Sequence, residues 1–197
     1  MDVLKLAEIA TIQTGLVIGR KKDKFNNASE FKYKKINLRS FGENGHLILN
    51  TLEDLNSVSE IHENFFTQLN DIVVRLFTPI NPIIIDKRSK GFLVPSQAAI
   101  IRLKKDVILP EYLRYFLSLP EATDRMLAGE GGSTQRAIRI SAFSNLDIPI
   151  PPVKLQLSIA RLIDIENQRN ALYNKLMEEE NKLILLKVRD IIGGNKK

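Results

Sequence analysis

The sequence predicts an α/β (α+β) domain with a short-stranded mixed β-sheet, followed by one long C-terminal coiled-coil helix. Three observations lead to this fold class. Short runs rich in β-branched residues lie between residues 33 and 103, where Pro79, Pro82 and Pro95 keep the strands short. After Pro110 the apolar residues follow a helical spacing. From residue 154 to residue 192 the chain contains neither proline nor glycine, so one continuous helix fits.

The first half of the chain predicts the strands of the sheet. Residues 3–14 fit a short helix or a pair of strands, and a loop then carries many basic residues. Residues 33–38 predict a strand with Ile36 and Leu38 on one face. A Gly-Glu-Asn-Gly turn at 42–45 precedes a short strand at 46–49. A buried strand is expected at 71–76, with further β structure at 83–85, 92–94 and 98–103.

The second half predicts three helices and a last strand before the long helix. Pro110 opens a helix over residues 111–117, and Pro120 opens a second helix that Gly129 ends. A glycine-rich polar loop at 129–136 precedes a short serine-capped helix at 141–146 and a strand at 147–150. Pro151 and Pro152 close the domain. We therefore expect a domain at 1–152, a helix at 153–192 and a disordered tail at 193–197.

A heptad pattern in the C-terminal helix predicts a partner helix. Six of the nine core positions are apolar, namely Leu162, Ile165, Leu172, Leu176, Leu183 and Leu186. The other three are Arg169, Glu179 and Asp190; the first two either set the register across an interface or are simply exposed. A rod of about 57 Å is too long to pack fully on this domain. A homodimer through the C-terminal helix is the expected assembly.

The net charge of +6 is confined to one early segment. Between residues 20 and 39 there are eight basic residues against Asp23 and Glu30, and outside that segment basic and acidic residues are equal, at 21 each. Such a patch is typical of proteins that bind polyanions, nucleic acid before an anionic membrane. The alternative is a solvated loop with surplus lysines.

Composition restricts the other classes. The chain has no cysteine, which excludes disulfides and thiolate metal sites. Its first residues lack the apolar core of a signal peptide, and no run approaches the roughly 18 apolar residues that span a bilayer. We expect a soluble, cytoplasmic protein.

Catalytic signatures are absent from the sequence. There is neither a phosphate loop nor a glycine fingerprint for a dinucleotide or S-adenosylmethionine, so no cofactor is expected. His46 and His62 lack metal-ligand spacing, so no metal is expected. Metal-assisted cleavage of nucleic acid needs clustered carboxylates with a lysine. The nearest candidate for such a cluster is Asp86-Lys87 together with Asp71 or Glu111, but the spacing of these residues in the sequence does not require them to lie close together. We expect no catalytic residue.

Three loops contain residues suited to DNA contacts. Glutamine and arginine make bidentate bonds to adenine and guanine, whereas lysines, hydroxyls and glycine N–H groups suit phosphates. Arg20, Gln135 and Arg136 are therefore the expected base-reading residues, and Lys21, Lys22 and Lys24 the expected phosphate contacts. The remaining candidates are Arg39, Lys87, Arg88, Lys90, Ser133 and Thr134. A mobile surface loop is the alternative for residues 133–136.

Several motifs follow one another in a characteristic order. They are Leu6-Ala7-Glu8-Ile9-Ala10 with Thr14-Gly15, Asn70-Asp71-Ile72-Val73-Val74-Arg75, Pro95-Ser96-Gln97-Ala98-Ala99-Ile100-Ile101-Arg102, Leu109-Pro110-Glu111-Tyr112-Leu113-Arg114-Tyr115-Phe116-Leu117, Ile140-Ser141 up to Leu146, Ile148-Pro149-Ile150-Pro151-Pro152, and Gln156 with Ile159-Ala160. From residue 4 to about 165, this order resembles the target-recognition domain of Type I restriction-modification specificity subunits. Leu155 departs from the pattern, because the family usually has glutamate before that glutamine.

The resemblance implies a non-catalytic DNA-binding subunit. Such subunits bind half of a split DNA site with each recognition domain and hold methyltransferase and endonuclease subunits on their helices. Full subunits have two recognition domains and two helical regions, whereas this chain has one of each. A single-domain form would pair through its helix as a two-fold dimer on an inverted-repeat target.

Two other classes remain open from the sequence. The chain could be the recognition portion of a fused methyltransferase-nuclease or a cryptic nuclease, which incubation with plasmid, Mg²⁺ and S-adenosylmethionine would reveal. It could also be a coiled-coil adaptor without specific DNA binding. A mobility shift with random duplexes would separate that adaptor from a DNA-binding subunit.

Overall fold

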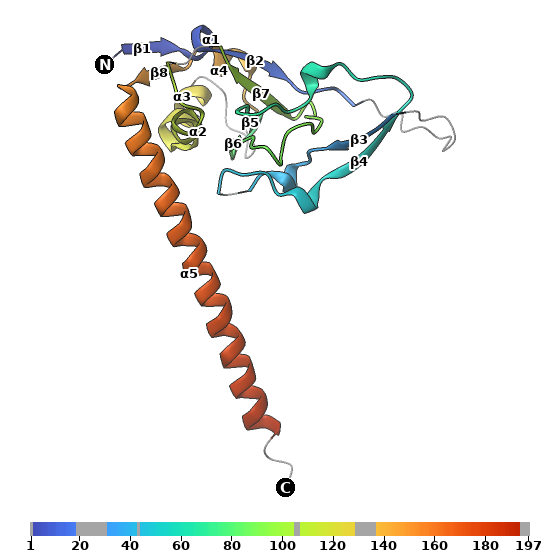
Figure 1. Cartoon of the computed structure of the whole chain (residues 1–197), viewed down its shortest axis with the longest axis vertical. Coiled ribbons are helices and arrows are strands. Elements are labelled where there is room, and N and C mark those ends of the chain that lie inside the picture. The colour runs from blue at the N-terminus through green and yellow to red at the C-terminus, as the bar shows by residue number, and fades with distance from the viewer. Residues whose placement is uncertain (1, 19–30, 43, 105–106, 129–136, 194–197) are drawn as a thin grey trace. The chain divides into compact units, whose positions relative to one another are not determined.

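The computed structural model describes residues 2–18, 31–42, 44–104, 107–128 and 137–193. The chain divides into two compact units, Met1–Leu157 and Ser158–Lys197 (Figure 1). The first unit contains the strands and the short helices, and the second consists of most of the last helix. Among the described residues, no helix combines the length and the apolar composition that crossing a membrane requires.

A four-stranded antiparallel sheet forms the centre of the first unit. Its order is β2 (Ala10–Thr14), β7 (Ala98–Leu103), β5 (Ile72–Arg75) and β6 (Ile83–Ile84). β7 lies between β2 and β5, with Ile101 opposite both Ile12 and Ile72. The sequences of β5 and β7 are almost continuously apolar because both faces of these strands are buried.

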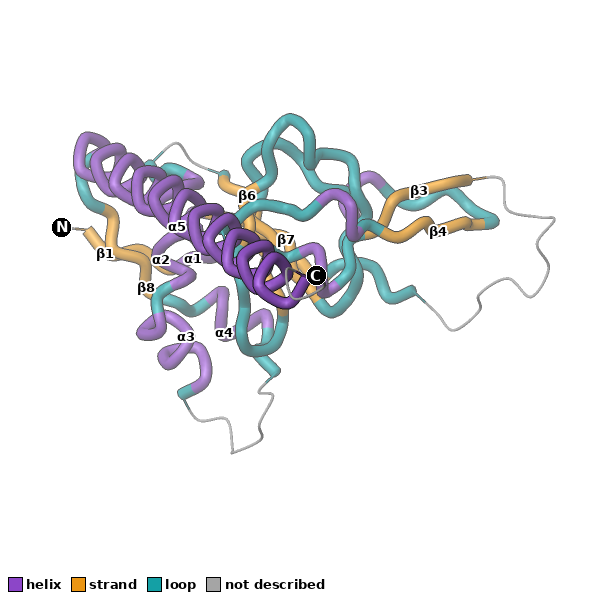
Figure 2. Tube along the Cα trace, turned by 90° about the horizontal axis from the view of Figure 1, so that it is seen from below, coloured by secondary structure: helices purple, strands orange, loops and turns teal. Residues whose placement is uncertain are grey.

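Two smaller sheets, each of two antiparallel strands, accompany the central sheet (Figure 2). β1 (Asp2–Lys5) pairs with β8 (Asp147–Ile150), and β3 (Phe31–Lys35) pairs with β4 (Glu53–Ser57). Parallel pairing occurs as isolated bridges, at Leu16 with Pro95 and at Lys35 with Leu93. The predicted α+β fold class with short strands is confirmed.

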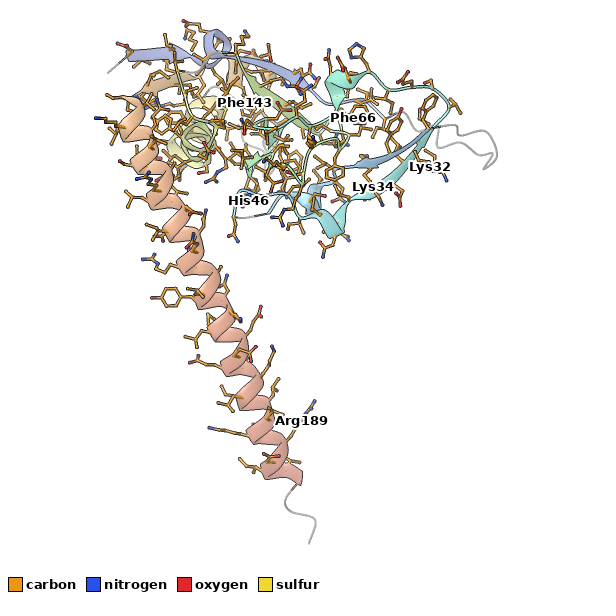
Figure 3. The ribbon with its side chains drawn as sticks, in the orientation of Figure 1. Lys32, Lys34, His46, Phe66, Phe143 and Arg189 are labelled. Carbon is orange, nitrogen blue, oxygen red and sulfur yellow. The ribbon has the colours of Figure 1, made fainter. Side chains whose placement is uncertain are left out.

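Four short helices pack with the sheets of the first unit. They are α1 (Leu6–Ile9), α2 (Pro110–Ser118), α3 (Pro120–Leu127) and α4 (Ile140–Ser144). Pro110 and Pro120 each occupy the first turn, where the missing N–H costs nothing. α4 packs against α1 and β2 and buries Phe143 completely (Figure 3). Three 3-10 turns lie at Leu38–Ser40, Leu49–Thr51 and Glu63–Phe65.

The last helix, α5 (Val153–Gly193), is continuous over 41 residues. Its first turn belongs to the first unit, where Gln156 is buried. Every side chain from residue 168 to residue 193 is exposed. The predicted continuous helix is therefore present, and it includes Gly193, which the sequence predicts to be the first residue of the tail. The remaining tail residues, 194–197, lie outside the described residues.

Several predicted elements differ from the structure in the first sixty residues. Residues 3–14 form a strand, one helical turn and a second strand, and the two strands pair with β8 and β7 rather than with each other. Residues 46–49 form no strand, because Leu47 makes only an isolated bridge to Phe41. Leu38 is 42% exposed whereas Ile36 is buried, since the chain turns into a 3-10 helix after residue 37.

Three further differences concern capping and strand number. Residues 92–94 make isolated bridges through Leu93, to Lys35 and Phe66, instead of a strand. α4 begins one residue before Ser141, so Arg139 occupies the N-cap position and the predicted serine cap is wrong. The sequence does not predict β4, because its single leucine gives too weak an alternation. Gly129, the predicted end of the second helix, lies outside the described residues.

A buried ion pair joins the entry of β5 to the end of β7. Arg102 donates to both carboxylate oxygens of Asp71, from Nε at 2.8 Å and from Nη2 at 2.7 Å. Asp71 is 1% exposed, and its Oδ2 also accepts the backbone N–H of Gln68 at 2.7 Å. The bond to Asp71 raises the pKa of Arg102 further above its usual value. Two motifs far apart in the sequence are thus one structural unit.

Backbone geometry explains two other motif residues. A Cβ on Gly15 would lie 2.3 Å from the carbonyl oxygens of Val94 and Pro95, so only glycine fits beside that segment. Tyr112 donates its hydroxyl to the carbonyl of Pro149 at 3.0 Å and so ties α2 to β8. Burial raises the pKa of Tyr112 above its usual value.

Gln156 connects the start of α5 to the segment before α2. Its Nε2 donates to the carbonyls of Val107 at 3.0 Å and Pro151 at 2.8 Å, and its Oε1 accepts the N–H of Leu109 at 2.8 Å. The side chain is completely buried, whereas the neighbouring Leu155 is 49% exposed. The departure from the family pattern at Leu155 therefore falls on a solvent-facing position.

We expect Gln156→Leu to lower the free energy of unfolding by about 3 kcal/mol, because buried backbone groups lose their partners. Urea unfolding followed by circular dichroism measures the change. Leu155→Gln is the matched control on the adjacent exposed position and should change stability by about 0.5 kcal/mol or less. Equal effects of the two substitutions would contradict the assigned role of Gln156.

Candidate nucleic-acid interface

The loop after β6 presents three cations from a hydrogen-bonded turn. Asp86 accepts hydrogen bonds from the N–H groups of Arg88 and Ser89, both at 2.9 Å, and from the Ser89 hydroxyl at 2.6 Å. The Ser89 hydroxyl bond is the main cause that lowers the pKa of Asp86. Ser89 is itself buried, and its carbonyl accepts from the Thr67 hydroxyl at 2.8 Å. The predicted contacts Lys87, Arg88 and Lys90 are all exposed around this turn.

A small cavity adjoins the same loop. Its volume is about 400 Å³, and its lining combines Asp86, Arg88 and Ser89 with residues from the segment between β3 and β4, namely His46, Leu47, Leu49 and Asn50. Arg88 is only loosely paired with Asp86, at 3.7 Å, and its side chain is 85% exposed. The fold therefore brings residues 46–50, with the polar side chains of His46 and Asn50, beside the basic loop.

The early basic segment is partly neutralised by acids from β4. Lys34 pairs with Asp54 at 2.7 Å and Lys35 with Glu53 at 2.8 Å, each across the β3–β4 ribbon. These acids lie outside the charge count of residues 20–39, so the sequence overestimates the local positive charge. Exposed pairs of this kind are weak and are screened by salt. Arg39 is exposed, as a phosphate contact requires.

Eight of the predicted DNA contacts lie outside the described residues. They are Arg20, Lys21, Lys22, Lys24, Ser133, Thr134, Gln135 and Arg136. The chain after the second group returns to the domain at a defined place, because Ile138 donates to the carbonyl of Leu76 at 2.9 Å and Ala137 pairs with Phe77.

Two of the three acids considered for nuclease chemistry, Asp71 and Asp86, have structural roles. Asp71 is held by Arg102, and Asp86 organises its own turn. In the parts of the chain that the structure describes, no three His, Cys, Asp or Glu residues are grouped as a metal site would require. His62 accepts the N–H of Asn64 on Nδ1 at 3.2 Å, and His46 is exposed.

A larger cavity, of about 640 Å³, lies beside α2 and α3. It is lined by the segment 78–82 and by residues of α2 and α3, with Arg114 as its cation. Burial lowers the pKa of Arg114. The sequence predicts no site there, and the four predicted DNA contacts that the structure describes, Arg39, Lys87, Arg88 and Lys90, do not line it.

The predicted seam on α5 is exposed along the helix. Its apolar members are between 52% and 69% exposed: Leu162, Ile165, Leu172, Leu176, Leu183 and Leu186. Two charged seam residues pair along the helix itself, Arg169 with Glu166 and Glu179 with Lys182. The helix thus presents a row of leucine and isoleucine, and two of the three charges at core positions, Arg169 and Glu179, have partners on the same helix.

Comparison with known sequences and structures identifies the family. The sequence profile described as "Type I restriction modification DNA specificity domain" matches residues 1–181. The chain belongs to this family. Membership assigns it to the recognition part, rather than the catalytic part, of Type I restriction-modification systems.

Solved structures have the fold of this specificity domain. The HsdS subunit from Thermoanaerobacter tengcongensis matches with a TM-score of 0.68 at 16% identity, over 95% of this chain and 47% of that one. The S subunit from M. genitalium matches with a TM-score of 0.58 at 17% identity, over 99% of this chain and 46% of that one.

A third structure, described as concerning complex assembly and conformational transition of the type I R-M system, matches with a TM-score of 0.71 at 16% identity. The match covers 97% of this chain and 48% of the chain in that structure. The specificity-domain chain thus spans about half the length of these structures. Among curated proteins no match was found.

Proposed function

We propose that the chain binds DNA sequence-specifically as the specificity component of a Type I restriction-modification system and directs methyltransferase and endonuclease subunits to a bipartite site. The observation that carries the proposal is the family match over residues 1–181. One similar structure is described in terms of complex assembly of such a system, which supports the proposed protein partners.

The proposed division of labour follows the chain. Residues 1–152 recognise the target, and residues 153–192 form the helix that holds partners. Within the recognition domain, the segments 20–39, 87–90 and 131–136 contact DNA. Phosphate contacts supply most of the affinity, and Arg20, Gln135 and Arg136 read bases.

The proposed assembly is a homodimer through α5. Exposed leucines and isoleucines at heptad spacing favour a second copy of the same helix as partner. A two-fold dimer presents two recognition domains in inverted orientation, so the expected target is an inverted repeat. The length of the paired helices then sets the gap between the half-sites.

Selection from a random duplex pool tests sequence-specific binding. We expect a defined consensus and an affinity that falls steeply with salt, because released counterions drive phosphate binding. Combined Gln135→Ala and Arg136→Ala substitutions should weaken cognate binding by about 10-fold or more through lost base contacts. Titration by fluorescence anisotropy measures both effects. Gln68→Ala with Arg125→Ala is the matched control, since both residues lie outside the proposed loops.

Cognate affinity that barely changes in the Gln135/Arg136 variant would argue against the proposed readout. A chain that binds no duplex at low salt would instead be the coiled-coil adaptor. Incubation with plasmid, Mg²⁺ and S-adenosylmethionine completes the comparison, because cleavage or methylation by the pure chain would assign it to a catalytic class.

A further inference from the structure

The β3–β4 ribbon has two chemically different faces. Lys32 lies opposite Asn56 and Lys34 opposite Asp54, and all four side chains are exposed. On the other face, Tyr33 lies opposite Leu55, and both are half-buried. Residues alternate between faces along a strand, so the four polar side chains share one surface. We call this surface, formed by Lys32, Lys34, Asp54 and Asn56, the outer face of the ribbon.

The inner face fixes the ribbon on the domain. The Tyr33 ring lies 6.4 Å from that of Phe31 and 5.2 Å from that of Phe66, and its hydroxyl accepts the N–H of Ile61 at 3.2 Å. The backbone of β3 is held as well, because Leu93 donates to the carbonyl of Lys34 at 2.9 Å. Figure 3 labels Lys32, Lys34 and Phe66 on this part of the structure. The ribbon that carries the outer face is therefore held in place by contacts with the rest of the domain.

The charges of the outer face suit base edges better than a phosphate backbone. Lys32 has no ion-pair partner among the described residues, whereas Lys34 is paired with Asp54 at 2.7 Å. A surface built only to hold phosphates would gain nothing from a carboxylate that is 78% exposed. Base edges in the major groove, in contrast, offer partners for all three residue types: guanine for lysine, adenine for asparagine and the cytosine amino group for aspartate.

We infer that the β3–β4 ribbon enters the major groove and that Asn56 and Lys32 read bases there. The inference rests on the proposed DNA-binding function. It adds Asn56 and Lys32 to the expected base-reading residues Arg20, Gln135 and Arg136. A two-stranded ribbon fits the dimensions of the major groove, which is about 12 Å wide. Asn56 and Lys32 lie directly opposite each other in the register, so they reach neighbouring base pairs.

Pool selection with the full chain tests the inference. Asn56→Ala should relax the consensus at one position and weaken binding to the wild-type consensus by about 5- to 150-fold. Its dependence on salt should match that of the wild type, because asparagine releases no counterion. Lys32→Ala should relax a second, adjacent position. Asn174→Ala, an exposed asparagine on α5, is the matched control and should leave consensus and affinity unchanged.

Each outcome decides between distinct conclusions. If the wild-type protein selects a consensus, and both ribbon variants select the same consensus with affinities within about twofold of the wild type, the ribbon inference is wrong. The proposed function would still stand. Weaker binding without a changed consensus, and with a smaller salt slope in Lys32→Ala, would identify a phosphate contact and also overturn base reading. Wild-type protein that binds no duplex would overturn both. Circular dichroism verifies that the exposed substitutions leave the fold intact.

Discussion

Replacing Arg102 with leucine is expected to lower the free energy of unfolding by about 3 kcal/mol. The substitution leaves the carboxylate of Asp71 buried without its charged partner, and removing one member of such a pair costs about 3–5 kcal/mol. The lower end applies because the Arg102 side chain is 27% exposed, so water relieves part of the loss. Urea unfolding at neutral pH, followed by circular dichroism, gives the value.

A double-mutant cycle separates this ion pair from other effects of the substitution. Asp71→Leu combined with Arg102→Leu should recover part of the lost stability, because no charge is then buried alone. Lys104→Leu provides the control at an exposed position on the same segment, with an expected change of about 0.5 kcal/mol or less. Additive effects of the two leucine substitutions would show that Asp71 and Arg102 are not energetically coupled.

Leu176→Asp combined with Leu183→Asp is expected to abolish the proposed dimer. Each substitution places a carboxylate in the apolar seam of both helices, where burial of an unpaired charge is strongly unfavourable. Sedimentation velocity at micromolar concentration should show monomers. Binding to an inverted repeat should weaken by about 100-fold or more, because the second half-site no longer binds intramolecularly.

The matched control for the seam lies on the same helix, outside the heptad core. Leu185→Asp combined with Val188→Asp adds the same charge at exposed apolar residues that the seam does not include. This variant should remain dimeric. A seam variant that still sediments as a dimer, or a wild-type chain that is monomeric throughout the micromolar range, would contradict pairing through α5.

The motifs behind the family resemblance have different physical origins. Gly15 is required by a close approach of the backbone, and Asp71 and Arg102 are required by each other. Gln156 satisfies the backbone of a neighbouring segment. Each motif is weak alone because its reason lies in another part of the chain. Their order is sufficient to predict the family, whose profile covers residues 1–181.

The candidate site shows where charge patterns in a sequence are incomplete. The sequence predicts a basic segment over residues 20–39, yet the acids that pair with Lys34 and Lys35 come from β4. Sequence reasoning misses Asp54 and Asn56 for the same reason. The only sequence signal for β4 is the single Leu55 among polar residues, and strand pairing rather than local preference forms this ribbon.

Helices and strands that are determined by a few neighbouring residues can be predicted from the sequence alone. The predicted strands at Ala98–Leu103 and Asp147–Ile150 have the bounds that the structure shows, and prolines mark the starts of α2 and α3. The absence of proline and glycine predicts one continuous α5. Steric restrictions and β-branched preferences act within a few residues, so no distant contact is needed to recognise them.

The meeting of distant segments, in contrast, follows only from the packed domain. β1 pairs with β8 across almost the whole recognition domain, Arg102 binds Asp71, and Lys32 comes to lie opposite Asn56. Hydrogen bonds and burial would stabilise a strand or side chain against any segment of compatible sequence. The local sequence alone therefore does not specify which segment it pairs with. The simultaneous packing of the entire core selects each partner, and the surfaces that we propose for DNA follow from that selection.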